Sequence, residues 1–100
     1  MTAPFVARFT VPASHPALPG HFPGRPIVPG VVLLDAVIAA ARARFGLGAA
    51  SGFPRTKFLS PVLPEEEVAA EIARTPAGRI AFTCRVGSRI VASGDVEFVP

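Results

Sequence analysis

The sequence contains no tryptophan or tyrosine, and it has one methionine and one cysteine among its 100 residues. The single cysteine, Cys84, excludes a disulfide within the chain and a metal site built from several cysteines. Because it lies where apolar and polar residues alternate, we expect it to pack as a small hydrophobic side chain.

Several motifs of other functions are also missing. There is no G-x-S-x-G motif, which carries the nucleophile of many hydrolases, and neither a G-x-G-x-x-G motif nor a P-loop. The stretch GLGAAS, residues 46–51, follows a predicted helix rather than a strand, so it does not fit a nucleotide-binding motif. The sequence therefore favours neither a nucleophilic hydrolase nor a nucleotide-binding enzyme.

The charge is modest and dispersed. Ten Lys and Arg residues against seven Asp and Glu give a formal net charge of +3. The basic residues are spread from Arg8 to Arg89, whereas a nucleic-acid-binding protein clusters them. The first residues show no secretory signal, and the apolar helical run is too short to cross a bilayer. We expect a soluble, cytoplasmic protein with no nucleic-acid partner and no membrane span.

The chain is rich in apolar residues, which make up 50% of it and favour a globular fold over disorder. At this length we expect one domain, residues 1–100. Because such a short chain buries only a marginal core by itself, we also expect self-association.

The hydrophobic pattern predicts five strands and one helix. Strand-like alternation occurs in residues 5–11, 68–73, 80–86 and 90–98, and residues 53–59 are also predicted to form a strand. Residues 46–52 are expected to form a flexible connection, and Gly87-Ser88 is typical of a two-residue hairpin turn. Residues 12–30 contain six prolines and three glycines, which predicts a rigid loop over the core.

Residues 30–45 are predicted to form the helix, which ends before Gly46. Apart from Asp35 it is apolar on every side up to Ala41, and such a helix is usually buried. Successive hairpins imply an antiparallel sheet. We predict an α+β hotdog fold, in which an antiparallel sheet of about five strands wraps around one long buried helix.

Two ionisable residues stand out in GHFPGRPIVPGVVLLD, residues 20–35. His21 lies in the proline-rich loop, and a restrained imidazole suits acid–base catalysis. Asp35 lies in the apolar helix, where burial of a carboxylate is costly. A structural Asp that accepts loop amides and a catalytic acid fit these residues equally well. His15 is assigned to loop surface or packing.

Gly30 begins the helix, so its backbone N–H lacks an intrahelical acceptor and could polarise a carbonyl. A plain helix-starting glycine is the alternative. A base, an acid and a carbonyl-binding amide together describe proton abstraction next to a carbonyl with loss of a hydroxyl from the next carbon. That reaction is the dehydration of a 3-hydroxyacyl compound.

The motif GHFPGRPIVPGVVLLDA, residues 20–36, resembles the H-F-P-G-x-P-x-x-P-G motif, followed by an acid, of the 3-hydroxyacyl-acyl-carrier-protein dehydratases. KFLSPVLPEEEV, residues 57–68, resembles their K-F-x-x-P-V-x-P-G-D segment. The resemblance implies a hotdog fold and a homodimer whose sheets join edge to edge. It also implies a 3-hydroxyacyl group on the phosphopantetheine of acyl carrier protein, and neither a metal nor a redox cofactor.

The resemblance implies roles for individual residues. His21 of one subunit would take the C2 proton, and Asp35 of the other would protonate the leaving hydroxyl. The amide of Gly30 would bind the thioester carbonyl. The substrate site would comprise Gly30, Phe22, Ile27 and Pro29.

A basic rim could bind the acidic carrier protein or a phosphate-bearing substrate. Ordinary solvated surface is the alternative for each of its members. The candidate residues are Arg42, Arg44, Arg55 and Lys57.

The sequence departs from the family pattern at several points. The acid is Asp35 rather than the Glu of the larger branch, and Ala39 stands where Gln is frequent. The absence of tyrosine excludes a tyrosine gate. These features indicate a short, specialised member that serves a secondary lipid, polyene or polyketide pathway.

Two alternatives stay open. One is a hotdog thioesterase or enoyl-thioester hydratase, although the thioesterases lack H-F-P-G and the hydratases carry Asp before His. The other is a non-catalytic hotdog subunit that binds acyl carrier protein or completes a heterodimer.

Overall fold

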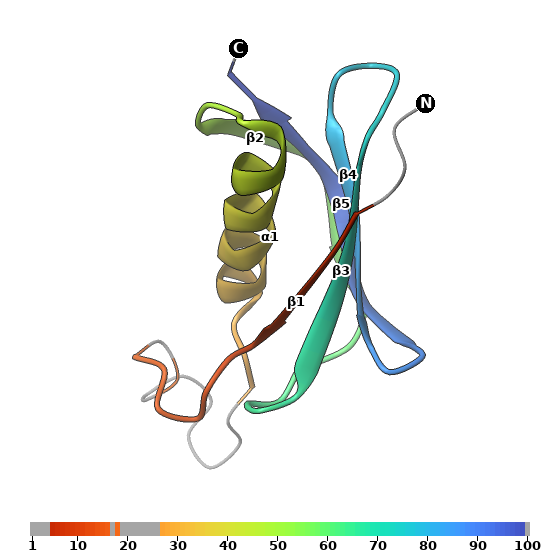
Figure 1. The fold of residues 1–100 in the computed structure, drawn as a ribbon. Helices are drawn as coiled ribbons and strands as arrows, with labels where there is room; N and C mark the ends of the chain where they lie inside the picture. The colour runs from red at the N-terminus through yellow and green to blue at the C-terminus, as the bar shows by residue number, and fades with distance from the viewer. Residues whose placement is uncertain (1–4, 17, 19–26, 100) are drawn as a thin grey trace.

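The computed structural model of the chain describes residues 5–16, 18 and 27–99. These residues form one antiparallel sheet with the strand order β1-β3-β4-β5-β2. Figure 1 shows the helix α1 on one side of the sheet, which curves behind it. The elements in chain order are β1 (Phe5–Thr10), α1 (Gly30–Phe45), β2 (Ala50–Phe58), β3 (Glu67–Arg74), β4 (Ile80–Val86) and β5 (Arg89–Phe98).

The strands β3 and β4 follow the predicted alternation. Their inward-facing apolar side chains are buried against α1 and the rest of the core, whereas their neighbours are more exposed. At the β4–β5 hairpin, Gly87 has a φ of 60°, which is the left-handed conformation that glycine adopts without strain. The prediction of a two-residue turn at this point is confirmed. The buried alternating set is Val68, Ala70, Ile72, Ile80, Phe82 and Cys84.

The strand β2 begins at Ala50, so the prediction of a flexible connection over residues 46–52 is wrong for its last three residues. These residues, Ala50, Ser51 and Gly52, carry no large apolar side chain that would mark a strand, and the β2–β5 register shifts on both sides of Gly52. Such irregularities accommodate glycine and proline, and Pro54 is tolerated because β2 is an edge strand. A pattern of period two could not detect this part of the strand.

The start of β5 also differs from the prediction. Strict alternation over residues 90–98 would place Ile90 on the inner face together with Ala92 and Val96, but Ile90 is 40% exposed while Val91 is buried. The β4–β5 register shifts between Cys84 and Arg85, where β5 carries one extra residue. This extra residue changes the face of the side chains before it. The bulge matters for the site because it places the Val91 carbonyl next to the segment that follows β2.

The bounds of α1 agree with the prediction, and Gly46 ends it in the left-handed conformation. The prediction that it is buried on every side is wrong for the single chain. Leu33, Val37 and Ala41 are buried, at a spacing of four residues. Val31 and Asp35 lie on the opposite face of the helix and are exposed. The sheet covers one face of the helix and leaves the other open.

Candidate active site

A groove of about 530 Å³ opens at the start of α1. One wall comes from the chain that enters the helix and the other from the end of β2 and the segment after it. Three of the four predicted substrate-binding residues, Ile27, Pro29 and Gly30, line this groove together. Its lining is mainly apolar, and Ser60 is the one hydroxyl side chain among the described residues there.

Gly30 occupies a position where a larger residue would collide with its neighbour. A Cβ atom built on it would come within 2.7 Å of the Phe58 ring. The ring at the end of β2 therefore lies directly against the tip of the helix. Val32 donates its N–H to the Pro29 carbonyl at 3.0 Å. The amides before it belong to the first turn, where no intrahelical acceptor exists and the helix dipole is positive.

Asp35 lies on the open face of α1, and the expectation that its carboxylate is buried is wrong for the single chain. It lines a second groove of about 360 Å³ between α1 and the end of β1. The cost of burying a charge therefore does not explain this residue in one isolated chain. Burial of Asp35 would require a cover over the open face from outside the described residues.

His15 lines the same groove as Asp35, which the sequence did not suggest. The backbone N–H of His15 donates to the Pro12 carbonyl at 3.0 Å. Glu65 ties this turn to the β2–β3 connection, because its N–H donates to the Val11 carbonyl and its carboxylate accepts the Ala13 N–H at 2.7 Å. The prolines at positions 12 and 16 favour a turn here, but they do not indicate that His15 lies beside Asp35.

Two further residues of the predicted site, His21 and Phe22, lie outside the described residues. Their assignment as catalytic base and substrate-binding residue therefore stays a prediction. The nearest described residues on either side are Leu18, which is buried, and Ile27, which lines the groove at the helix start.

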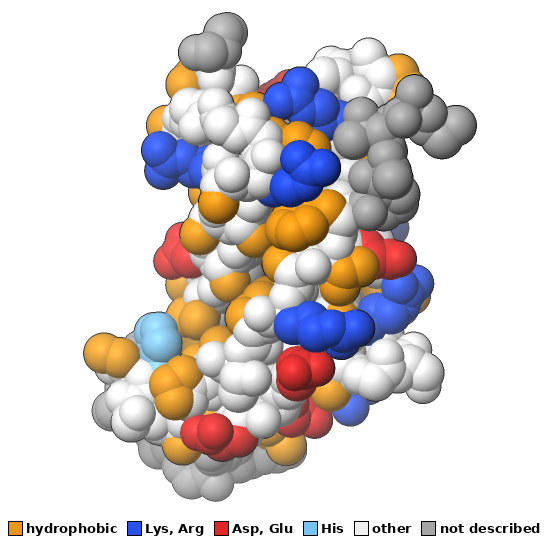
Figure 2. Space-filling view, in the orientation of Figure 1, with side chains coloured by type: hydrophobic (Ala, Val, Ile, Leu, Met, Phe, Trp, Pro, Cys, Tyr) orange, Lys and Arg blue, Asp and Glu red, His pale blue; other side chains and the backbone are white. Residues whose placement is uncertain are grey.

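The predicted basic rim falls into two pairs. Arg42 and Arg44 lie in the last turn of α1, and Arg44 stacks on the Phe45 ring at 5.3 Å. Arg55 and Lys57 lie near the end of β2, which contacts the start of α1. Arg42 lies twelve positions after Gly30 in α1, which corresponds to a rise of about 18 Å. Figure 2 accordingly shows basic side chains distributed over this face, with acidic ones among them.

Other chemistry is limited in the described part of the chain. Burial raises the pKa of the Cys84 thiol to about 11, so this residue packs as a hydrophobic side chain rather than acting as a nucleophile. No group of three or more His, Cys, Asp and Glu residues there could hold a metal ion. None of the helical segments described is long and apolar enough to span a membrane.

The chain matches known proteins over most of its length. The family described as ApeI-like, ApeI dehydratase, matches residues 2–95. The 3-hydroxyacyl-[acyl-carrier-protein] dehydratase FabZ of Chlamydia trachomatis is 34% identical over 98% of this chain and 73% of the relative. FabZ of Thermus thermophilus is 31% identical, over 95% and 76% respectively.

Solved structures share the fold. The dehydratase heterocomplex ApeI:P from Xenorhabdus doucetiae superposes with a TM-score of 0.85 at 19% identity, over 100% of this chain and 90% of the other. The fluoroacetyl-CoA thioesterase FlK gives a TM-score of 0.68 at 18% identity, over 96% and 84%.

These comparisons confirm the predicted hotdog fold and the predicted dehydratase family. The FabZ relatives are hydro-lyases of 3-hydroxyacyl thioesters, which agrees with the reaction expected from the motif in residues 20–36. The chain belongs to the ApeI-like dehydratase family.

Proposed function

We propose that the protein removes water from a 3-hydroxyacyl thioester carried on acyl carrier protein and releases the trans-2-enoyl thioester. The observation that supports this most directly is the apolar groove that begins at the Gly30 helix tip. A thioester carbonyl at the tip would be followed by an acyl chain against the apolar walls. The names of the FabZ relatives support the carrier protein as the source of the substrate.

The reaction needs a base, an acid and a carbonyl-binding group. His21 takes a proton from C2, and the electron pair forms the C2–C3 double bond as the C3–O bond breaks. Asp35 protonates the leaving hydroxyl, which departs as water. The amide of Gly30 stabilises the negative charge that develops on the thioester oxygen. The reaction is redox-neutral, so it needs no cofactor beyond the phosphopantetheine arm that belongs to the substrate.

A second subunit would complete this site. Asp35 lies on an open helix face, so the partner subunit's His21 would reach it only if another chain covered that face. The strand β2 could form this contact, because it is an edge strand among the described residues and its Phe53 and Phe58 side chains are about half exposed. A homodimer through β2 gives two such sites. The ApeI:P heterocomplex supports a related hotdog chain as the alternative partner, and the mass in solution separates the two.

A turnover assay tests the proposed function. We expect enoyl absorbance to appear when the protein receives a 3-hydroxyacyl thioester on acyl carrier protein. His21→Ala and Asp35→Asn should each lower the rate by about 10²- to 10⁴-fold, the usual contribution of a positioned acid or base. Asp95→Asn on β5 is the matched control and should retain the wild-type rate.

Other outcomes point to the alternatives. Wild-type rates in both variants would refute the catalytic assignment. Release of a free thiol without enoyl product would identify a thioesterase instead, as the FlK fold allows. Carrier binding without either product would identify a non-catalytic subunit. Localisation in the cytoplasm and a role in secondary lipid, polyene or polyketide synthesis stay predictions.

A further inference from the structure

One wall of the groove at the helix tip is a short segment without regular secondary structure, residues 59–62. Such a segment has no strand ladder to hold it, so its position depends on individual hydrogen bonds. Leu59 and Ser60 both donate their N–H groups to the Val91 carbonyl, at 2.9 and 3.4 Å. The bulge in β5 therefore anchors the beginning of this wall.

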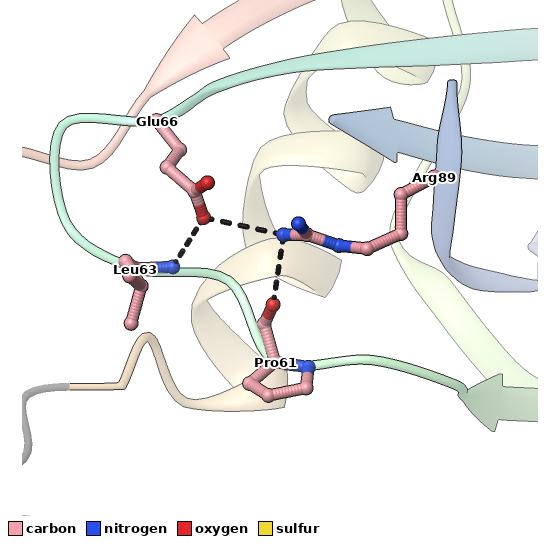
Figure 3. Close-up of polar contacts among 4 residues, drawn as sticks. All are labelled: Pro61, Leu63, Glu66 and Arg89. Atoms are coloured by element: carbon pink, nitrogen blue, oxygen red, sulfur yellow. Dashed lines mark hydrogen bonds and ion pairs between the residues drawn. The ribbon is translucent and has the colours of Figure 1, made fainter. Parts of the chain in front are cut away.

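An ion pair between Arg89 of β5 and Glu66, which precedes β3, holds the middle of the wall. The Arg89 guanidinium donates to the Pro61 carbonyl at 3.2 Å and to the Glu66 carboxylate at 3.3 Å. The same carboxylate oxygen accepts the Leu63 N–H at 2.8 Å (Figure 3). Arg89 and Glu66 together thus bind backbone groups on both sides of Val62.

Val62 joins this wall to the opposite one. Its carbonyl accepts the Val28 N–H at 2.8 Å, and its side chain is 1% exposed. Val28 lies two residues before Gly30, at the point where the chain enters the helix. A shift of the segment at Pro61 or Leu63 would therefore be transmitted to the chain that positions the helix tip.

We propose that Arg89 and Glu66 are positioning residues that set the width of the groove and thereby the acyl-chain length it accepts. This inference rests on the proposed function, because it takes the groove as the site of the acyl chain. Neither side chain lines the groove, so both act only through the backbone that they bind. Their side chains are 45% and 28% exposed, so their removal should loosen the wall without opening the core.

Binding of inert analogues separates this inference from turnover. S-alkyl pantetheine thioethers with a short, a medium and a long alkyl chain cannot be dehydrated, and their affinities can be measured by calorimetry. The wild-type protein should prefer one length. Arg89→Gln and Glu66→Gln should each flatten that preference by about three- to tenfold, the scale expected for a partly exposed, charge-assisted contact.

Two controls exclude a general effect of lost charge. Arg79→Gln removes the Arg79–Glu97 pair, which involves the opposite end of β5 from Arg89, and should leave the preference unchanged. Arg89→Lys keeps the charge and a donor and should restore part of it. Thermal melts show whether each variant is folded, and the two Gln variants provide independent tests.

The outcomes distinguish this inference from the proposed function. An unchanged length preference in folded Arg89→Gln and Glu66→Gln overturns the positioning role, even if the wild-type enzyme dehydrates its substrate. The absence of any thioether binding to the wild type also overturns it, because the groove then takes no acyl chain. A flattened preference supports the positioning role whether or not turnover is detected.

Discussion

The two faces of α1 carry different kinds of residue. One face, represented by Leu33 and Val37, is buried against the sheet and belongs to the core. The other face, represented by Val31 and Asp35, is open in the single chain, although it carries the large apolar side chain of Val31. The first face stabilises the fold. Among the described residues nothing covers the second face, which is why the proposed function gives it a catalytic acid and a partner subunit.

Truncation of the buried face should give the largest effect on stability. Leu33→Ala removes a side chain that is 4% exposed and should lower the free energy of unfolding by about 2–5 kcal/mol. Asp35→Asn on the open face should change it by only about 0.5 kcal/mol or less. Denaturant unfolding followed by circular dichroism measures both. Comparable losses in the two variants would show that Asp35 has a structural role and would remove the distinction between the faces.

Gly30 lies at the helix tip, where a substitution should affect activity and stability differently. Gly30→Ala places a Cβ where the Phe58 ring lies, so the half-exposed ring has to move within the groove. We expect kcat/KM to fall by about ten- to a hundredfold, since small displacements of a binding group are costly. The stability should be unchanged or slightly higher, because alanine favours a helix over glycine by about 1 kcal/mol.

The matched variant is Gly30→Ala combined with Phe58→Ala, which removes the collision. Recovery of part of the lost rate in the double variant would attribute the defect to the ring. No recovery would show that the methyl group itself blocks the carbonyl-binding amide. A Gly30→Ala protein with the wild-type rate would contradict a substrate site at the helix tip.

Local signals in the sequence predicted much of the fold. The helix bounds follow from a proline before residue 30 and a glycine at residue 46, and the strands β3 and β4 follow from strict alternation. The start of β2 and the bulge in β5 could not be predicted in this way. Both involve register shifts against a partner strand, and a pattern within one strand carries no information about its partner.

The site was predictable only where one segment contains it. Ile27, Pro29 and Gly30 are close in sequence and line one groove, and their role in substrate binding stays a prediction. The opposite wall was missed because the residues that hold it, Arg89 and Glu66, are brought together by the fold. The exposure of Asp35 was missed for another reason. Apolar composition favours a buried face, but it carries no information on whether the same chain buries it.

Basic side chains near the two ends of α1 can be compared in the same way, and we expect their effect on carrier-protein binding to be the smallest of the predicted effects. Arg42 and Arg44 lie at one end of the helix, and Arg55 and Lys57 lie near the other. If an acidic carrier protein delivers its arm to the groove at the helix tip, the pair on β2 should contribute more to its binding.

Replacement of Arg55 and Lys57 by Gln should weaken carrier binding by about fivefold at most at low salt, and the effect should fade as salt screens exposed charges. Arg42 and Arg44 replaced by Gln form the matched control of equal charge, and calorimetry at two salt concentrations measures both proteins. A larger loss from the helix-end pair would place the carrier at the far end of α1. The phosphopantetheine arm would then have to cross the open face of the helix, past Asp35, to reach the Gly30 amide.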